Sequence, residues 1–466
     1  MNESKPKRKF VMPHIYVILF TLITLSVIAT YIVPAGSYDR EEVDGRSVII
    51  PDTFSYAEQT PVGILEFMTA IPRGVEQTVA IIFGIMAIGA LFRVIEKAGI
   101  IDVILNFLIR SFGNKGMLII PTIVIPLALF VALTGNIESS LIFLPALLPL
   151  FLRLGYDRMA ATGTVLMATV VGFAVAITAP ANLGTAQTIA ELPLYSGIGF
   201  RLIILAVMLA VGILFIIFYI KKVQKDPAKT LITDNVDNSQ FIKDETDSPE
   251  LSTRTYVGTG IFILALGFML FGIFQYQWYF TELAGFYLFA GIVSGLVAGL
   301  KPSGIAEAMN EGIQNIVLGA LIVGVARAIS VVLEDGAILD TVVYGLSIIV
   351  TMIPETFVPV AMMVTQGLLN FLIPSGSGQA AATMPIMVGL VDLTDMTRQT
   401  AVLAFQFGDG FSNIFYPTSG YFMAALAIAK IKYTDWIKFI WPLLLIWYGL
   451  GAVFLIIAYF INWGPF

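Results

Sequence analysis

Apolar runs of membrane-spanning length recur along almost the whole chain, and they constrain its fold more than any other feature. Of the 466 residues, 58% are hydrophobic and only 12% are charged, about half the charged share of a soluble domain. The charges gather at the N-terminus, in residues 39–58 and in residues 221–254. The remainder is too apolar for a soluble enzyme, a disordered protein or a nucleic-acid-binding protein. We therefore expect a chain that is dissolved in membrane lipid and has no nucleic-acid partner.

Several kinds of chemistry are excluded by residue types that the chain lacks. Cysteine is absent and His14 is the only histidine, which removes disulfides, thiol nucleophiles and sites rich in cysteine or histidine. The sequence has neither a phosphate-binding motif for ATP hydrolysis nor an evident acid–base dyad. We therefore predict neither an enzyme nor a primary pump, and no resident cofactor apart from a coupling ion, Na⁺ or H⁺.

The apolar runs predict an all-α polytopic protein with about nine transmembrane helices. The first run, residues 10–33, follows a basic cluster and is not followed by a small-residue cleavage site, which indicates a retained anchor with a cytoplasmic N-terminus. The other spans are predicted at about 74–97, 159–190, 199–220, 255–276, 284–301, 312–333, 396–430 and 436–461. Spans 159–190 and 396–430 are too long for one straight helix, and Pro180 and Pro417 interrupt them. Such a break survives in lipid only where it is packed in protein or lines a cavity.

Two further apolar stretches fit re-entrant hairpins better than spans. Residues 116–153 turn around Thr134–Ser140 and have basic residues on both flanks, so both ends are predicted to be cytoplasmic. Residues 357–391 turn around Pro374–Gln379 and have acidic flanks, so this hairpin is predicted to enter from outside. Each tip should then lie near the middle of the membrane.

The charge distribution also predicts the domain organisation of the chain. We expect a multi-pass protein of the bacterial cytoplasmic membrane, in contact with lipid. Its predicted parts are an anchor helix with an external loop (1–73), a first repeat (74–221), a polar cytoplasmic linker (222–254), connecting transmembrane helices (255–311), a second repeat (312–435) and a C-terminal transmembrane helix (436–466).

The two halves carry matching residues at a nearly constant offset. Gly74 is as far from Gly312 in the sequence as Glu96 is from Glu334, and several other pairs follow in the same order. The predicted orientations of the matching spans are opposite, which makes this an inverted-topology repeat. Repeats of this kind place substrate and ion sites at the membrane midplane, where broken helices meet.

Polar residues at the hairpin tips and helix breaks are therefore the candidate site. A helix that starts inside the membrane presents free N–H groups to an anion, whereas carbonyl and hydroxyl oxygens suit a small hard cation such as Na⁺. The predicted substrate-binding residues are Asn136, Glu138, Ser139, Ser377, Gly378, Gln379, Asp409, Asn413, Thr418 and Ser419. The candidate Na⁺ ligands are Gly135, Asn136, Asn182, Thr185, Ser375 and Thr418.

Glu138 and Asp409 are the most informative of these residues, because a carboxylate is costly in the membrane interior. Each is interpreted as binding a cationic substrate group, as carrying a coupling proton, or as paired with an internal arginine. Arg93 and Arg327 are the plausible arginine partners. No arginine stands at either predicted tip.

Three motifs carry a family resemblance that covers nearly the whole chain. They resemble the YfcC-like family, which belongs with the anaerobic C4-dicarboxylate carriers of the DcuC type in the ion transporter superfamily. The motifs are Gly135–Ser140, Pro374–Ala380, and Phe407–Asn413 with Tyr416–Gly420.

The resemblance implies a homodimer in which a scaffold domain carries a transport domain that moves like an elevator and contains both hairpins. It also implies that some relatives exchange arginine for ornithine, while others carry C4-dicarboxylates. Related Na⁺-coupled carriers have Ser-Asn-Thr at both tips, but this chain has Gly135-Asn-Ile-Glu138 and Ser375-Gly-Ser377. That departure is a reason to question Na⁺ coordination.

These observations predict a secondary transporter of small carboxylate-bearing metabolites, foremost basic amino acids such as arginine and ornithine, by exchange or ion coupling. Two carboxylates in the pocket would suit a cationic side chain and repel a dianion. A C4-dicarboxylate transporter is the alternative. An ion channel is a remote alternative, because it would need a continuous pore.

Overall fold

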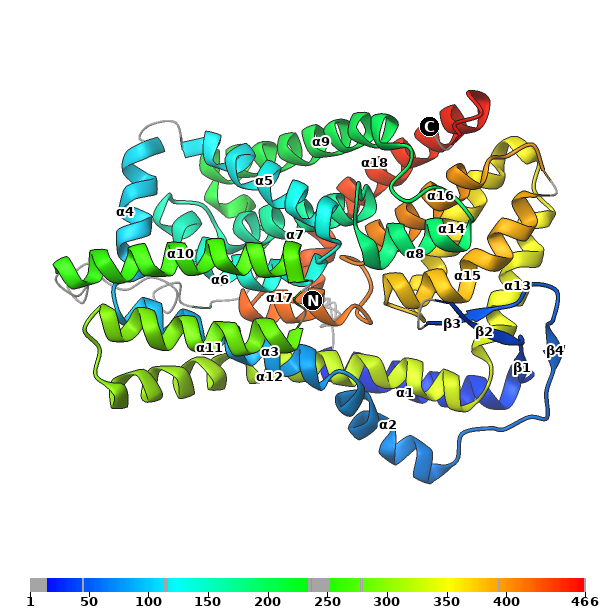
Figure 1. Cartoon of the computed structure of the whole chain (residues 1–466), viewed down its shortest axis with the longest axis horizontal. Coiled ribbons are helices and arrows are strands. Elements are labelled where there is room, and N and C mark those ends of the chain that lie inside the picture. The colour runs from blue at the N-terminus through cyan, green and yellow to red at the C-terminus, as the bar shows by residue number, and fades with distance from the viewer. Residues whose placement is uncertain are drawn as a thin grey trace, which may run out of the picture.

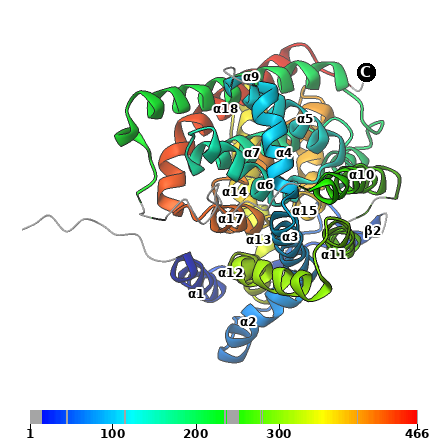
Figure 2. The same ribbon diagram turned by 90° about the vertical axis from the view of Figure 1, so that its left-hand side faces the viewer.

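A computed structural model of the chain describes residues 15–43, 46–112, 116–233, 252–276, 280–392 and 394–464, together with Val236 and Trp278. Most of the long helices run along the long axis of the molecule (Figure 1). Helices α9 and α18 lie on one side, and α1, α2 and α12 lie on the opposite side (Figures 1 and 2). The remaining helices of both halves fill the space between them.

The first half begins after the anchor helix α1 (Ile15–Ile32). Its helices are α2 (Ile64–Gln77), α3 (Val79–Lys97), α4 (Ile100–Phe112), α5 (Ile119–Thr134), α6 (Ser140–Arg153), α7 (Arg158–Ala174), α8 (Thr185–Ile189) and α9 (Ile198–Lys225). Short 3₁₀ turns precede α5 (η1, Gly116–Leu118) and α6 (η2, Ile137–Ser139), and a π-helical turn precedes α8 (η3, Pro180–Gly184). Another short turn, η4 (Pro227–Lys229), follows α9.

The second half follows two connecting helices, α10 (Thr253–Tyr276) and α11 (Phe280–Val297). It consists of α12 (Pro302–Asp335), α13 (Leu339–Thr351), the turn η7 (Glu355–Phe357), α14 (Val358–Asn370), α15 (Gly376–Val391), α16 (Arg398–Ser412), α17 (Gly420–Ile428) and α18 (Tyr433–Phe460). The predicted linker, 222–254, falls mostly outside the described residues.

The helices of the two halves correspond in order and spacing. Helix α2 begins at Ile64 and α3 ends at Lys97, while α12 begins at Pro302 and ends at Asp335. Both boundaries are thus displaced by the offset that relates Gly74 to Gly312, and α4 to α9 match α13 to α18 nearly as well. The matching helices begin earlier than the predicted repeat boundaries at 74 and 312.

Glycines bring the matching helices α2–α3 and α12 into backbone contact. A Cβ on Gly312 would meet the carbonyl of Gly89, and a Cβ on Gly74 would meet the carbonyl of Gly324. The contacts pair an early residue of one helix with a late residue of the other, so the matching helices run antiparallel. Small residues permit such close packing of helices in membranes. The antiparallel arrangement is the one that an inverted repeat requires.

Two helical hairpins occupy the predicted positions. Helices α5 and α6 turn at 135–139, and α14 and α15 turn at 371–375. The second turn lies earlier than predicted, because Gly376–Gln379 already belong to α15. The long apolar segments 159–190 and 396–430 are broken as expected, between α7 and α8 and between α16 and α17. Whether the hairpins re-enter the membrane stays a prediction.

Six helices in the described part of the chain are long and apolar enough to cross a membrane: α3, α9, α10, α11, α12 and α18. The other three of the nine predicted spans are the shorter helix α1 and the two broken segments. The count of nine therefore stays a prediction.

The external loop predicted within residues 1–73 contains more structure than expected. Strand β1 (Gly36–Ser37) pairs with β4 (Ser55–Tyr56), and β2 (Arg40–Val43) pairs with β3 (Arg46–Ile49). Helix α2 follows. Helices α4 and α13 were not predicted either, because thirteen residues are too few for a span and both helices carry an aspartate in the first turn. Tyr38 and Ile49 pack with Val343 of α13, which holds the strands against the second half.

Candidate functional site

A cavity of about 470 Å³ lies where the hairpin tips and helix breaks of both halves meet. Its walls come from the end of α2, the start of α3, α12, both hairpin turns and both breaks. Its lining includes Gln77, Thr78, Thr134, Gly135, Glu138, Phe173, Asn182, Arg327, Ser375, Gly376, Ser377, Asn413, Thr418, Ser419 and Tyr421. The volume is within the usual range for small-molecule sites.

The first hairpin turn places Glu138 in this cavity. Gly135 ends α5 with a φ of 74°, a left-handed conformation that glycine adopts without a steric penalty. A Cβ at Gly135 would lie 3.0 Å from Ala179 and 3.6 Å from Asn182 Oδ1. The turn is therefore packed against the first helix break, and η2, which carries Glu138, follows immediately.

The first break is held to this turn by backbone hydrogen bonds. The amides of Ile177 and Thr178 both donate to the carbonyl of Ala132, at 2.7 and 3.2 Å. Asn182 donates from Nδ2 to the carbonyl of Phe173 at 3.1 Å and accepts from the amide of Leu183 at 2.6 Å. The amide side chain of Asn182 thus replaces backbone bonds that Pro180 interrupts.

The second hairpin turn reaches the same place from the other half. Ser375 caps α15 by accepting from the amide of Gly378 at 3.3 Å, and Ser330 of α12 donates to the carbonyl of Leu372 at 2.9 Å. A Cβ at Gly376 would lie 2.8 Å from Phe173 and 3.1 Å from Asn182. Both hairpin turns therefore touch the first break.

Asp409 lies directly behind Gly376 and is fully buried. A Cβ at Gly376 would be 3.2 Å from Asp409 Oδ2. Oδ1 accepts a 3.3 Å hydrogen bond from Asn413, whereas Oδ2 has no hydrogen-bond partner among the described residues. The backbone carbonyl of Asp409 accepts from Asn370 and Asn413, which fixes this turn of α16.

Other buried polar atoms around the cavity also have no partner in the described structure. Such atoms are uncommon in native proteins, and a cluster of them indicates a place for a ligand, an ion or water. They are Ser139 Oγ, Ser140 Oγ, Thr418 Oγ1 and Tyr421 OH. Tyr421 lines the same cavity as Glu138.

The predicted site residues fall into three groups. Eight of them line the cavity: Gly135, Glu138, Asn182, Ser375, Ser377, Asn413, Thr418 and Ser419. Asn136, Ser139 and Asp409 are buried next to lining residues, and Gly378 lines an adjoining pocket. Thr185 and Gln379 instead make structural hydrogen bonds, Gln379 with Gln366 and Thr185 with the carbonyl of Pro180. The roles of all these residues remain predictions.

Arg327 lies in the cavity wall, although the sequence named it only as a plausible partner of the two acids and not as a site residue. Of the three interpretations of Glu138 and Asp409, pairing with Arg93 or Arg327 is not seen among the ion pairs of the described residues. Arg93 pairs with Glu96 and Glu311, and Arg327 pairs with Glu334 at 3.1 Å. No arginine is close to a hairpin tip in sequence, yet α12 brings Arg327 into the cavity.

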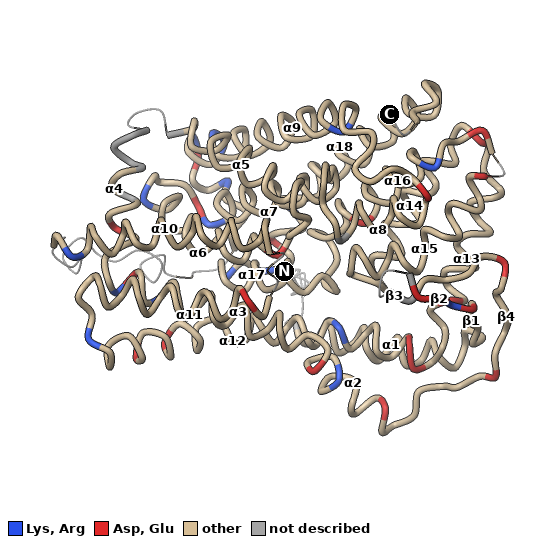
Figure 3. Tube along the Cα trace, in the orientation of Figure 1, with Lys and Arg blue, Asp and Glu red and all other residues tan. Residues whose placement is uncertain are grey.

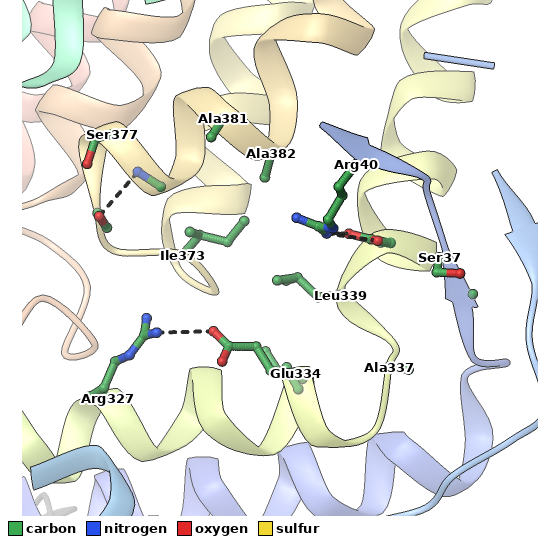
Figure 4. Close-up of a pocket in the computed structure, with 15 residues that line it drawn as sticks. Ser37, Arg40, Arg327, Glu334, Ala337, Leu339, Ile373, Ser377, Ala381 and Ala382 are labelled. Carbon is green, nitrogen blue, oxygen red and sulfur yellow. Dashed lines mark hydrogen bonds and ion pairs between the residues drawn. The ribbon is translucent and has the colours of Figure 1, made fainter. Parts of the chain in front are cut away.

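A second pocket, of about 570 Å³, adjoins the central cavity (Figure 4). We call it the outer vestibule, after the side that the predicted orientation gives it. Arg327, Ser375 and Ser377 line both spaces. The vestibule is also lined by the ion pair of Arg40 with Asp340, which joins strand β2 to α13 at 2.7 Å.

A third pocket, of about 250 Å³, lies on the opposite side of the central cavity. We call it the inner pocket. It is lined by Glu96 and Asp102, which occupy the positions of the first half that match Glu334 and Asp340 of the vestibule. It has no lining residue in common with the central cavity. Charges thus mark both ends of the molecule, while few lie between them (Figure 3).

The site does not contain a cluster of typical metal-binding side chains among the described residues. Within the described ranges, no three histidine, cysteine, aspartate or glutamate residues come together. Na⁺ does not need such a cluster, since carbonyl, hydroxyl and amide oxygens suffice. The candidate Na⁺ ligands are divided between the cavity wall and buried structural positions, and their role stays a prediction.

The model of the family described as C4-dicarboxylate anaerobic carrier, DcuC, matches residues 12–460. The chain belongs to the DcuC family. With its membrane-length helices, it is therefore a multi-pass membrane transporter of that family, as the motifs predicted.

Two curated proteins resemble this DcuC-family chain along nearly all of its length. An Escherichia coli K12 protein named "Putative basic amino acid antiporter YfcC" is 30% identical and covers 94% of both chains. An uncharacterised Haemophilus influenzae protein is 26% identical over 98% of this chain and 99% of its own.

Two solved transporter structures also match the DcuC-family chain. The Alcanivorax borkumensis YdaH transporter has a TM-score of 0.45 at 16% identity, with 97% of this chain and 99% of the other covered. Neisseria gonorrhoeae MtrF has a TM-score of 0.43, also at 16% identity, with 96% and 95% covered.

Proposed function

We propose that this chain is a secondary transporter that exchanges basic amino acids, such as arginine and ornithine, across the bacterial cytoplasmic membrane. The observation that carries the proposal is the charge of the central cavity. Glu138 lies in its wall, and Asp409 lies behind Gly376 with one oxygen unpartnered. Neither carboxylate has an ion-pair partner among the described residues.

Burying an uncompensated carboxylate is costly, and a cation that enters the site removes part of that cost. A basic amino acid carries an ammonium group and a second cation on its side chain, so it supplies one positive group for each acid. The name of the Escherichia coli relative agrees with this chemistry. If the empty site is too unstable to move from one side of the membrane to the other, the transporter must return with a substrate bound. It then exchanges substrates and does not carry out net uptake.

A C4-dicarboxylate is the second candidate, and two observations favour it. The family is described by that substrate, and Arg327 places a guanidinium in the cavity wall. Two nearby carboxylates would nevertheless repel a dianion in a site of low polarity. We therefore rank the basic amino acid first.

We further propose that the chain works as a homodimer with its N-terminus in the cytoplasm, and that a transport domain with both hairpins moves relative to a scaffold. The antiparallel packing of α2–α3 on α12 supports two related arrangements of one fold. The vestibule adjoins the central cavity and the inner pocket does not, so this arrangement would be the outward-facing one. Na⁺ or H⁺ coupling remains an option beside exchange.

Counterflow into proteoliposomes tests the substrate. Liposomes loaded with unlabelled arginine should accumulate labelled arginine and ornithine, and empty liposomes should not. Succinate should neither be carried nor compete. If labelled succinate is carried while arginine neither moves nor competes, the proposal is wrong.

A further inference from the structure

Arg327 is the residue that connects the vestibule with the central cavity, and we propose that it anchors the carboxylate of the transported amino acid. This inference rests on the proposed function and deepens it. Arg327 would bind the anionic end of the substrate, which the two buried acids would not bind.

The guanidinium is held so that part of it remains available to a ligand. Nε donates to Gln77 Oε1 at 2.7 Å, and Nη2 donates to Glu334 Oε1 at 3.1 Å. For Nη1, the structure records no hydrogen bond to any described residue. An arginine offers a carboxylate two parallel N–H donors. A substrate carboxylate would therefore bind Nη1 and compete with Glu334 for Nη2.

The two partners of Arg327 lie on different sides of it. Glu334 lines the vestibule but not the central cavity, and Gln77 lines the central cavity but not the vestibule. In Figure 4 the Arg327–Glu334 ion pair lies on α12, facing the loop before α15. A carboxylate that enters from the vestibule thus meets Arg327 at the passage formed with Ser375 and Ser377. There the substrate carboxylate would take the place of the Glu334 carboxylate on the guanidinium. The guanidinium would thus stay neutralised while the substrate moves inward.

The charges of the whole site then match one class of ligand. Glu138 and Asp409 provide two negative groups, and Arg327 provides one positive group, which its Glu334 partner can release. A basic amino acid has the complementary set of two cations and one carboxylate. Agmatine, which is arginine without its carboxylate, should lose the contact with Arg327 and keep the others.

Comparing arginine with agmatine in the purified full-length protein tests this assignment. The wild-type protein should bind arginine more tightly than agmatine. Arg327→Gln should weaken arginine binding by about 10- to 100-fold, the loss typical of a charge-assisted hydrogen bond, and leave agmatine binding unchanged. Arg327→Lys should recover part of the preference. Arg93→Gln, which removes an ion-paired arginine outside the central cavity, should leave the preference intact.

A parallel loss for both ligands in Arg327→Gln, or an unchanged preference, would overturn the carboxylate assignment. Ligand-induced thermal stabilisation reports binding, and counterflow reports transport. If the wild-type protein binds neither cation but binds succinate, the proposed function fails. In that case the anchor still stands if Arg327→Gln loses succinate, and it falls if succinate binding is unaffected.

Discussion

In the first half, the turn between α5 and α6 carries Glu138, whereas the corresponding turn of the second half, residues 371–375 between α14 and α15, carries no charged side chain. In the second half, α16 carries Asp409, whereas the matching residue of α7 is Val171. Arg327 of α12 likewise matches Gly89 of α3. The helices repeat, but the charges that reach the cavity do not.

This difference shows how a repeated fold forms a single site. The two halves enclose a single cavity between them. A charged side chain that one half supplies therefore need not be repeated in the other half. Glycine on the opposite side then leaves room for that charge, as Gly376 does for Asp409. The substrate would consequently meet an acid from each half and a base from the second.

The largest expected effect comes from neutralising the charged tip. Glu138→Gln should raise the KM for arginine exchange at least about tenfold, because a charge-assisted contact in the site is lost. Ser377→Ala, at the uncharged second tip, should change it much less. Counterflow at several arginine concentrations measures both values. Equal effects at the two tips would contradict the charge difference between the halves.

The next effect tests the contact of the second tip with the first break. Gly376→Ala should strongly reduce transport, because the added methyl would lie 2.8 Å from Phe173 and 3.2 Å from Asp409. Gly389→Ala is a matched control on the same helix, since its methyl meets nothing within 4 Å. That control should fold and transport normally. Normal transport by Gly376→Ala would mean that the two halves do not pack tightly here during transport.

The sequence was sufficient for the hairpins and breaks because their signals are local. Apolar runs interrupted by Pro180, Pro417 or glycine-rich turns specify helices that end inside the apolar region. Arg327 could not be placed in this way. It reaches the cavity only because the glycines of α2, α3 and α12 allow those helices to pack closely, and that contact joins residues that are far apart in the sequence.

The short helices escaped prediction for a related reason. Helices α4 and α13 are too short for a span, and each carries an aspartate in its first turn, so neither was among the predicted spans. In the structure both aspartates are nearly buried, with arginine partners. The arginines come from other elements, α6 and β2, so their pairing could not be inferred from local sequence.

A smaller effect distinguishes these two matching ion pairs. Arg153 is the recorded partner of Asp102, at 2.6 Å, whereas Asp340 keeps a hydrogen bond from the Tyr38 amide if Arg40 is removed. Arg153→Gln should therefore destabilise the protein by about 1–3 kcal/mol. Arg40→Gln should cost about 1 kcal/mol or less, since Arg40 is 39% exposed. Thermal unfolding of the purified variants measures both losses of stability. A larger loss for Arg40→Gln than for Arg153→Gln would contradict the expected order.

The smallest expected effect concerns Arg158 and Arg398, which begin the matching helices α7 and α16. Arg158 donates to the carbonyls of Ala429 and Lys430, whereas Arg398 binds the carboxylates of Asp392 and Glu191. The hydrogen bond from Arg398 lowers the pKa of Asp392, which lies in the connection before α16. This pair therefore stabilises the fold above the ordinary aspartate pKa of about 3.9, and its contribution disappears as the pH falls through the lower, folded-state value.

Arg398→Gln should consequently lower the thermal unfolding temperature slightly at pH 7, and its deficit should shrink below about pH 4. The exposure of both side chains keeps the effect to about 1 kcal/mol or less. Arg158→Gln is the matched comparison, because carbonyl acceptors do not titrate and its deficit should be constant over the same range. If the two variants showed the same pH dependence, the carboxylate partners would not distinguish the halves at this position.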